Sequence, residues 1–276
     1  MRNTTNSLQV IAVTSGKGGA GKTTVATNLA ATLARQGKAV MLMDADLGLA
    51  NIDVVLGLHC KLNLSHVLAG QCRLEEAVVE GPEGIRIVPA SSGLQKMAQL
   101  SAAEHAGLIN SFSELPFAID TLIIDTAAGI NNTVTHFCQA ANEVIFVLCD
   151  DPSSLADGYG LIKVLNQQYG VNRFQMMANR IRQEDQGIAL YKRLLKTADQ
   201  FLNVNIEYIG AIPEDDYQQR ASRMQRLVTS AYPQSNSARA FQQLAANVNR
   251  LAPQEELGGA ISFFPEQTIN RQMSHA

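Results

Sequence analysis

Residues 16–24 read GKGGAGKTT and follow the apolar run VIAV at residues 10–13. The stretch fits the phosphate-loop pattern G-x-x-x-x-G-K-[ST], whose glycines permit a tight, partly left-handed backbone with N–H groups aimed at one anion. Behind the loop, apolar residues at 25, 29, 30 and 33 share one helical face, and Gly37 follows as the predicted C-cap. Because the loop lies between a predicted strand and a predicted helix, a nucleotide site is favoured over a glycine turn without a ligand.

The loop contains two lysines. In phosphate loops the lysine before the Ser/Thr neutralises the β- and γ-phosphates, and the hydroxyl holds Mg²⁺. These positions are Lys22 and Thr23 here. Lys17 is additional and is the most informative residue of the chain.

Composition limits the class of protein. The chain has 276 residues, of which 46% are hydrophobic and 5% aromatic, with a net charge of −3. A chain of this length and hydrophobic content can bury one sizeable core. Its net negative charge gives no overall basic surface for nucleic acid, so we expect no sequence-specific nucleic-acid binding. Four scattered cysteines, a polar N-terminal stretch and the lack of a long apolar run predict a cytoplasmic protein.

Seven short apolar runs alternate with segments of helical spacing; they lie at residues 10–13, 39–43, 85–88, 122–124, 144–148, 174–178 and 208–212. Runs that are continuously apolar indicate strands covered on both faces. The alternation predicts an α/β fold, a doubly wound and mostly parallel sheet with helices on both faces. A composition shift near Pro253 separates a predicted domain, 1–252, from a hinge and short tail, 253–276.

In such sheets ligands bind beyond the carboxyl ends of the strands, where this chain carries acidic residues. Asp125 ends an apolar strand, as in a Walker B motif that reaches Mg²⁺. Asp44 and Asp46 end another strand. We predict that Asp46 orients the attacking water and that Asp44 lies nearer the metal. The alternative for each is an aspartate that caps a turn.

Asn179 ends the strand at 174–178, and its amide can match an adenine edge through a paired donor and acceptor. Arg180 follows it, and we expect its side chain to lie over the base.

Three segments together carry a family resemblance: KGGAGKT at 17–23, DADLG at 44–48 and DTAAG at 125–129. They resemble the deviant Walker A ATPases of the MinD/ParA family. The more specific segments GLANIDV at 48–54, VLAG at 67–70, PASSG at 89–93, EHAGLI at 104–109 and ISFF at 261–264 are similar to its flagellar-number regulators of the FlhG (FleN) type. The resemblance implies a P-loop NTPase fold and a slow, Mg²⁺-dependent ATPase that binds ATP and ADP.

The resemblance also implies an ATP-dependent homodimer in which Lys17 reaches the partner's phosphates. Asp157 matches a family aspartate that holds this lysine when ATP is absent; the alternative is a residue of the first helical turn, favoured by the helix dipole. Asp151 stands where relatives usually have Glu, on the expected dimer surface. The segment at 210–215, with Pro213 and Glu214, resembles the family's adenine-lining segment.

The predicted site is therefore as follows. The catalytic residues are Lys17, Lys22 and Asp46. The nucleotide-binding residues are Gly16, Lys17, Gly18, Gly19, Ala20, Gly21, Lys22, Thr23, Thr24, Asn179, Arg180, Pro213 and Glu214. The metal residues are Thr23, Asp44 and Asp125, and the dimer and switch residues are Lys17, Asp151 and Asp157.

The resemblance implies regulation of flagellar number, placement and gene expression, with a FleQ-like transcription activator and the GTPase FlhF as partners. A ParA-type partitioning ATPase is an alternative, with Arg220, Arg223 and Arg226 as a basic stripe. A MinD-type positioning ATPase at the inner face of the membrane or the cell pole is another. The tail has little apolar area and one cation, so we expect weak or no direct membrane binding. Docking of Phe263 and Phe264 onto the protein's own body is favoured over contact with lipid.

Overall fold

The computed structural model describes residues 8–48, 50–90, 100–251 and 263–264. Its centre is one eight-stranded sheet with the strand order β3-β4-β2-β5-β1-β6-β7-β8. The strands are β1 (Gln9–Ser15), β2 (Val40–Ala45), β3 (Val79–Glu80), β4 (Arg86–Val88), β5 (Thr121–Ala128), β6 (Glu143–Cys149), β7 (Arg173–Ile181) and β8 (Asn205–Pro213). All neighbours pair in parallel except β3 and β4, so the predicted mostly parallel sheet is confirmed. The two-residue β3 has no apolar run and was not predicted.

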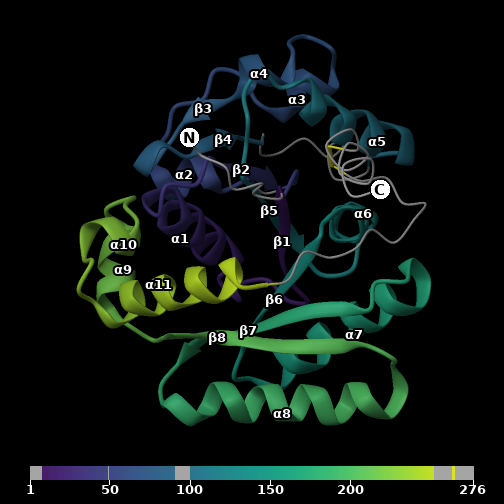
Figure 1. Ribbon diagram of the computed structural model, residues 1–276, viewed down its shortest axis with the longest axis vertical. Coiled ribbons are helices and arrows are strands. Elements are labelled where there is room, and N and C mark those ends of the chain that lie inside the picture. The colour runs from purple at the N-terminus through teal and green to yellow at the C-terminus, as the bar shows by residue number, and fades with distance from the viewer. Residues whose placement is uncertain (1–7, 49, 91–99, 252–262, 265–276) are drawn as a thin grey trace, which may run out of the picture.

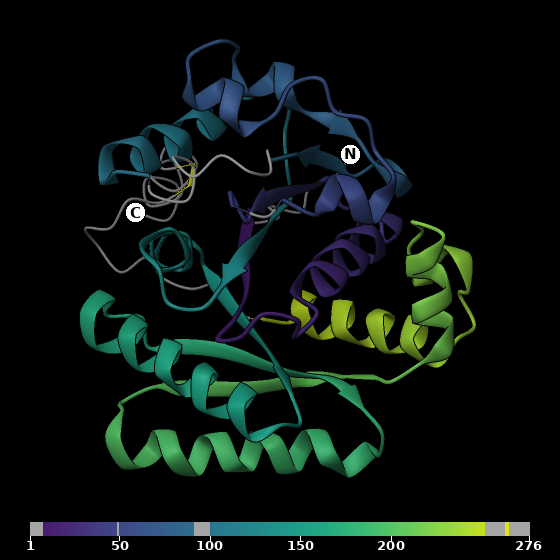
Figure 2. The ribbon, with the colours of Figure 1, turned by 180° about the vertical axis from the view of Figure 1, so that it is seen from behind.

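Helices cover both faces of the sheet (Figure 1, and from behind in Figure 2). They are α1 (Lys22–Arg35), α2 (Ile52–Leu56), α3 (Leu64–Leu68), α4 (Leu74–Ala77), α5 (Ala102–Ser111), α6 (Asn132–Ala140), α7 (Pro152–Tyr169), α8 (Glu184–Phe201), α9 (Asp216–Arg223), α10 (Val228–Ala231) and α11 (Asn236–Asn249). Among the described residues, short 3₁₀ turns lie at Pro82–Gly84 and Phe112–Glu114. None of the helices in the described part of the chain combines the length and apolar character needed to cross a bilayer.

Alternate residues of the strands belong to different cores. Ile11 and Val13 of β1 pack with α1 and α11, whereas Val10 and Ala12 pack on the opposite face with residues of α5 to α8. Helix α1 begins at Lys22, within the phosphate-loop motif, and ends at Arg35, with Gly37 beyond it at φ +90°. The predicted helix and its glycine stop are confirmed. Packing on both faces fixes β1 in the centre of the sheet. The loop that follows β1 therefore lies at the carboxyl edge of the sheet.

The Phe pair near the C-terminus is docked on the body of the protein. Phe263 and Phe264 are 4% and 3% exposed. The Phe263 ring lies edge-on to Phe112, with centroids 5.2 Å apart, and stacks on Phe137 at 6.5 Å. The favoured alternative, docking rather than exposure to lipid, is confirmed for these two residues. The predicted hinge and the other residues of the tail lie outside the described residues.

Candidate functional site

The phosphate loop has the backbone that its glycines allow. Gly19 and Gly21 have φ of +79° and +92°, in the left-handed region where a side chain is disfavoured. Gly16 is required for a different reason, because a Cβ there would lie 2.1 Å from the backbone carbonyl carbon of Asp157. The start of the loop is therefore pressed against α7.

The carbonyl group of Ala20 in the loop accepts hydrogen bonds from side chains of two neighbouring strands. The side-chain Nδ2 of Asn179 donates to the Ala20 oxygen over 2.7 Å, and the Cys149 thiol donates to the same oxygen over 3.6 Å. In a trans peptide the C=O and the following N–H point in opposite directions. The Gly21 N–H therefore points away from Asn179 and Cys149, so that β6 and β7 orient this peptide of the anion-binding loop.

Two acidic side chains lie side by side at the carboxyl edge of the sheet. Asp44 of β2 is in register with Asp125 of β5. Asp44 accepts hydrogen bonds from the backbone N–H groups of Asp46, Asn51 and Ile52, at 3.1, 3.0 and 3.1 Å. Burial raises the pKa of Asp44 to about 7, against the lowering effect of these three bonds. The bond from Asp46 forms the turn-capping contact stated as the alternative for Asp44. The bonds from Asn51 and Ile52 tie the start of α2 to the sheet, a contact that sequence reasoning missed. The role of Asp44 near the metal stays a prediction.

Asp125 is the second carboxylate, and one of its oxygens is orphaned. Oδ1 is buried and receives no hydrogen bond from the residues that the structure describes. Burial, and next the charge of Asp44, raise the pKa of Asp125 to about 8, whereas Thr23 and Lys22 lower it. A divalent cation beside Thr23 would satisfy this oxygen. Mg²⁺ commonly takes one or two protein ligands and completes its shell with phosphate oxygens and water, so Thr23 and Asp125 fit it.

Lys22 lies inside the loop at 8% exposure. Burial lowers its pKa, against the opposing charges of Asp125 and Asp46. A buried ammonium with two carboxylates nearby is placed to bind a polyanion, because phosphate oxygens would offset the cost of removing its charge from water.

Lys17 lies at the rim, with its side chain 49% exposed. Its ammonium donates to the Ser153 hydroxyl over 2.6 Å and lies 3.7 Å from Oδ1 of Asp151. The same Asp151 oxygen accepts from the Ser153 hydroxyl over 2.6 Å and from the Ser154 N–H over 2.7 Å, which caps α7. The bond from Ser153, followed by that from Ser154, lowers the pKa of Asp151.

The predicted contact between Lys17 and Asp157 is not formed among the described residues. Asp157 is exposed and lies in the second turn of α7, since Pro152 is the first residue of that helix. The alternative placement in the first turn was wrong as well. Asp151, the N-cap of α7, takes the ammonium. The role of Asp157 in switching stays a prediction.

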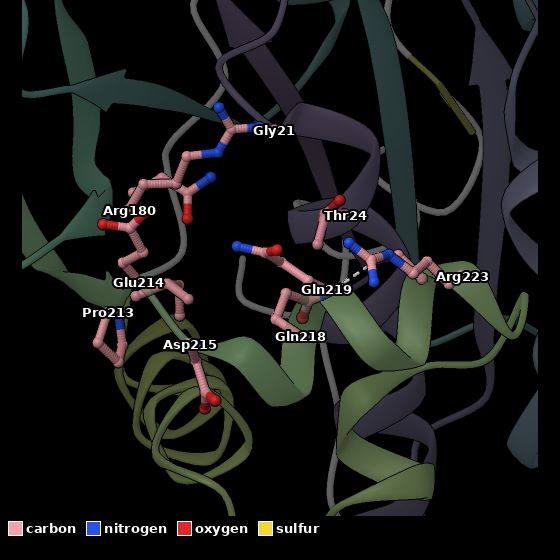
Figure 3. Close-up of a pocket in the computed structure, with 12 residues that line it drawn as sticks. Gly21, Thr24, Arg180, Pro213, Glu214, Asp215, Gln218, Gln219 and Arg223 are labelled. Carbon is pink, nitrogen blue, oxygen red and sulfur yellow. Dashed lines mark hydrogen bonds between the residues drawn. The ribbon is translucent and has the colours of Figure 1, made fainter.

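A cavity of about 490 Å³ adjoins the loop. Its lining includes the predicted residues Asn179, Arg180, Pro213 and Glu214 together with Gly21, Thr24, Ile212 and Asp215 (Figure 3). Helix α9 supplies the opposite side through Gln218, Gln219, Ser222 and Arg223. Sequence reasoning missed this wall; the only signal was Asp215 followed by a short polar helix, and that pattern is common on solvated surfaces.

The structure refines what Asn179 can recognise. Because one of the two N–H groups of Nδ2 is committed to Ala20, the side chain has its acceptor Oδ1 and a single N–H left for a ligand. The neighbouring Arg180 has φ +56°, an uncommon backbone conformation for a side chain of its size. Glu214 pairs with Arg182 at 2.8 Å instead of entering the cavity alone.

The predicted basic stripe is interrupted. Helix α9 ends at Arg223, so Arg226 lies beyond it. Arg220 lies over the Tyr217 ring, 5.5 Å from its centroid, and Arg223 lines the cavity. The three arginines therefore do not share one helical face.

Fold and site together define a P-loop nucleoside triphosphatase with a second lysine in the loop. The family model described as AAA domain matches residues 8–178. The chain is 47% identical to the antiactivator FleN of Pseudomonas aeruginosa over 262 residues, which cover 95% of this chain and 94% of FleN. It is 33% identical to the flagellum site-determining protein YlxH of Helicobacter pylori, covering 85% and 80%. The septum site-determining protein MinD from Pyrococcus horikoshii, complexed with Mg-ADP, has a TM-score of 0.74 at 26% identity, covering 88% and 96%.

The chain belongs to the MinD/ParA family of ATPases, close to the FlhG (FleN) type. It hydrolyses ATP and uses Mg²⁺ with ATP and ADP.

Proposed function

We propose that this chain is a nucleotide-switched regulator of flagellar number and placement. The observation that carries the proposal is the 47% identity to FleN across nearly the whole of both chains. Residues 1–252 form the ATPase domain in this proposal, and 253–276 a hinge and tail. The protein acts in the cytoplasm, with contact at the cell pole or the inner face of the membrane made through partners.

Each part of the site has one task in the proposed ATPase. The loop N–H groups, Lys22 and the α1 N-terminus bind the phosphates, while Thr23 and Asp125 hold Mg²⁺, which supplies charge stabilisation to the transferring phosphoryl group. Asp44 positions the segment that carries Asp46, and Asp46 orients the attacking water. The nucleoside occupies the cavity beside Asn179 and Arg180.

Lys17 connects the nucleotide to dimerisation. Its half-exposed position at the rim supports a role in which it leaves Ser153 and Asp151 and reaches the phosphates of a second copy. A cation supplied by the neighbouring subunit stabilises transition-state charge in the manner of an arginine finger. ATP then favours the dimer, and slow hydrolysis returns the monomer.

The dimer gates the binding of protein partners. Because FleN is named an antiactivator, the first partner is a flagellar transcription activator of the FleQ type. FlhF, a GTPase, is the second. Membrane contact through the Phe pair is disfavoured because Phe263 and Phe264 are buried.

Complementation tests the function. P. aeruginosa cells that lack FleN are given this chain, the Lys22→Ala variant or an empty vector, and flagella are counted by electron microscopy. The wild-type chain restores the normal number, and Lys22→Ala does not, although immunoblots show equal amounts of protein. Equal rescue by Lys22→Ala would contradict the nucleotide switch, and no rescue by either chain would contradict the flagellar assignment.

A further inference from the structure

Helix α9 forms the wall of the nucleoside cavity that faces the loop, and it brings two neighbouring glutamines to that wall. Asp215 fixes the helix, because its Oδ1 caps the Tyr217 N–H at 2.8 Å and its Oδ2 accepts from the N–H and hydroxyl of Ser237 at 2.9 and 2.8 Å. The start of α9 is therefore tied to α11 and does not depend on a ligand for its position.

Gln218 presents an unsatisfied acceptor. Its Nε2 donates to the Ser222 hydroxyl over 3.1 Å, which holds the amide plane. Its Oε1 is buried and accepts no hydrogen bond from the described residues. A buried acceptor without a donor is unfavourable. A ligand that brings an N–H or O–H to this oxygen therefore gains more binding free energy than it would by replacing a hydrogen bond to water.

Gln219 presents a free amide. Its side chain makes no hydrogen bond to any described residue and extends from α9 into the cavity, toward the side where Arg180 lies (Figure 3). A carboxamide can donate and accept at once, and it forms bidentate pairs with purine edges. One N–H of Asn179 is already bonded to Ala20, so Gln219 adds a complete donor and acceptor pair to the cavity.

We propose that Gln218 and Gln219 are specificity-determining residues that hydrogen-bond the nucleoside of the bound nucleotide. Gln218 accepts a hydrogen bond from a nucleoside donor, and Gln219 pairs with the base edge. The inference rests on the proposed nucleotide site. Three donors of an adenine nucleoside have the required chemistry, the 6-amino group and the ribose 2′- and 3′-hydroxyls, and the test distinguishes them.

Calorimetric titration of the full chain with ADP, inosine diphosphate, 2′-deoxyADP and 3′-deoxyADP, each with Mg²⁺, tests the inference without hydrolysis. The variants are Gln218→Met and Gln219→Met, which keep an unbranched side chain of similar length, and Gln200→Met on the exposed face of α8 is the matched control. Each cavity variant weakens ADP binding by about 2- to 12-fold, the range for one neutral hydrogen bond, and the control does not.

The analogues identify the donor. Wild type binds the analogue that lacks the true donor several-fold more weakly than ADP, and Gln218→Met binds ADP and that analogue equally. Wild-type affinity for ADP in both cavity variants would overturn the inference, as would equal binding of ADP and all three analogues by wild type. A Lys22→Ala variant with unchanged ADP affinity would instead contradict the proposed site itself, so the two failures are distinguishable.

Discussion

The Lys17 ammonium donates a hydrogen bond of 2.6 Å to the hydroxyl of Ser153, in the first turn of α7 of the same chain. That hydroxyl in turn donates a hydrogen bond to Asp151, which caps the same helix. The lysine proposed to act on a second subunit is thus held within its own subunit by two groups at the edge of the loop. Its release accompanies dimerisation in the proposed cycle.

Loosening this contact should favour the dimer. Ser153→Ala removes one partner of Lys17 but keeps the cap of α7, since the backbone N–H of Ser154 still donates to Asp151. The contact is solvent-exposed, so its loss is worth at most about 1 kcal/mol. We expect the ATP concentration for half-maximal dimerisation to fall about two- to fivefold in analytical ultracentrifugation. Ser111→Ala on α5 is the control, and an unchanged midpoint for Ser153→Ala would show that the contact does not restrain Lys17.

Asn179→Asp should disturb the loop and the nucleoside together. The substitution places a carboxylate oxygen where Nδ2 now donates to the Ala20 carbonyl, so two acceptors would face each other. Losing a buried partner in this way costs about 1–3 kcal/mol. Mg²⁺·ADP affinity in calorimetry should fall about 5- to 150-fold. Asn172→Asp, at the exposed position just before β7, is the control and should bind Mg²⁺·ADP as wild type does. Equal affinities for the two variants would mean that Asn179 does not contribute to the nucleotide site.

Glu143 predicts a pH dependence of stability far from the nucleotide. The side chain is 3% exposed and accepts from the Gln175 amide over 2.5 Å. Burial raises its pKa to about 7, against the lowering effect of Arg173. Between about pH 4.5 and 7 the folded chain therefore holds a proton that the unfolded chain has released, and this group makes folding less favourable as the pH rises.

Glu143→Gln removes that titration. The unfolding free energy of the variant minus that of wild type should increase from pH 5 to pH 8, on the order of 1 kcal/mol for each unit of pKa shift. Urea unfolding at four pH values measures the difference. A difference that stays constant across this range would mean that Glu143 has its ordinary pKa in the folded protein.

The docked Phe pair should contribute to stability. Phe263→Ala removes a ring that contacts Phe112 and Phe137, and the loss is about 3 kcal/mol, as for other buried phenylalanines. Phe201→Ala is the matched control because that ring is 67% exposed, and it should change the unfolding free energy by less than about 0.5 kcal/mol. Equal effects of the two substitutions in urea unfolding would contradict docking in solution.

The sequence predicts the sheet well because buried parallel strands are apolar along their whole length, and each predicted run lies within or overlaps a strand. It also predicts the loop, since only glycine suits the φ values at Gly19 and Gly21. β3 was missed because it is two residues long and pairs at an edge.

The site was predicted less completely where tertiary contacts decide the role of a side chain. Asn179 was expected to read a base, yet half of its amide is committed to Ala20. Lys17 was expected to meet Asp157, but its ammonium contacts Ser153 and Asp151, which lie at the start of α7. The α9 wall could not be foreseen, because its place at the cavity depends on the bonds between Asp215 and Ser237, which are 22 residues apart in the sequence.

The central claim is that ATP drives dimerisation through the two loop lysines, and light scattering tests it most directly. In the presence of Mg²⁺·ATP, Asp46→Ala should bind without hydrolysing and have twice the monomer mass, whereas Lys22→Ala and Lys17→Ala should remain monomers. In ADP all four proteins, wild type included, should be monomers. The same mass for Asp46→Ala and Lys22→Ala under ATP would contradict the account.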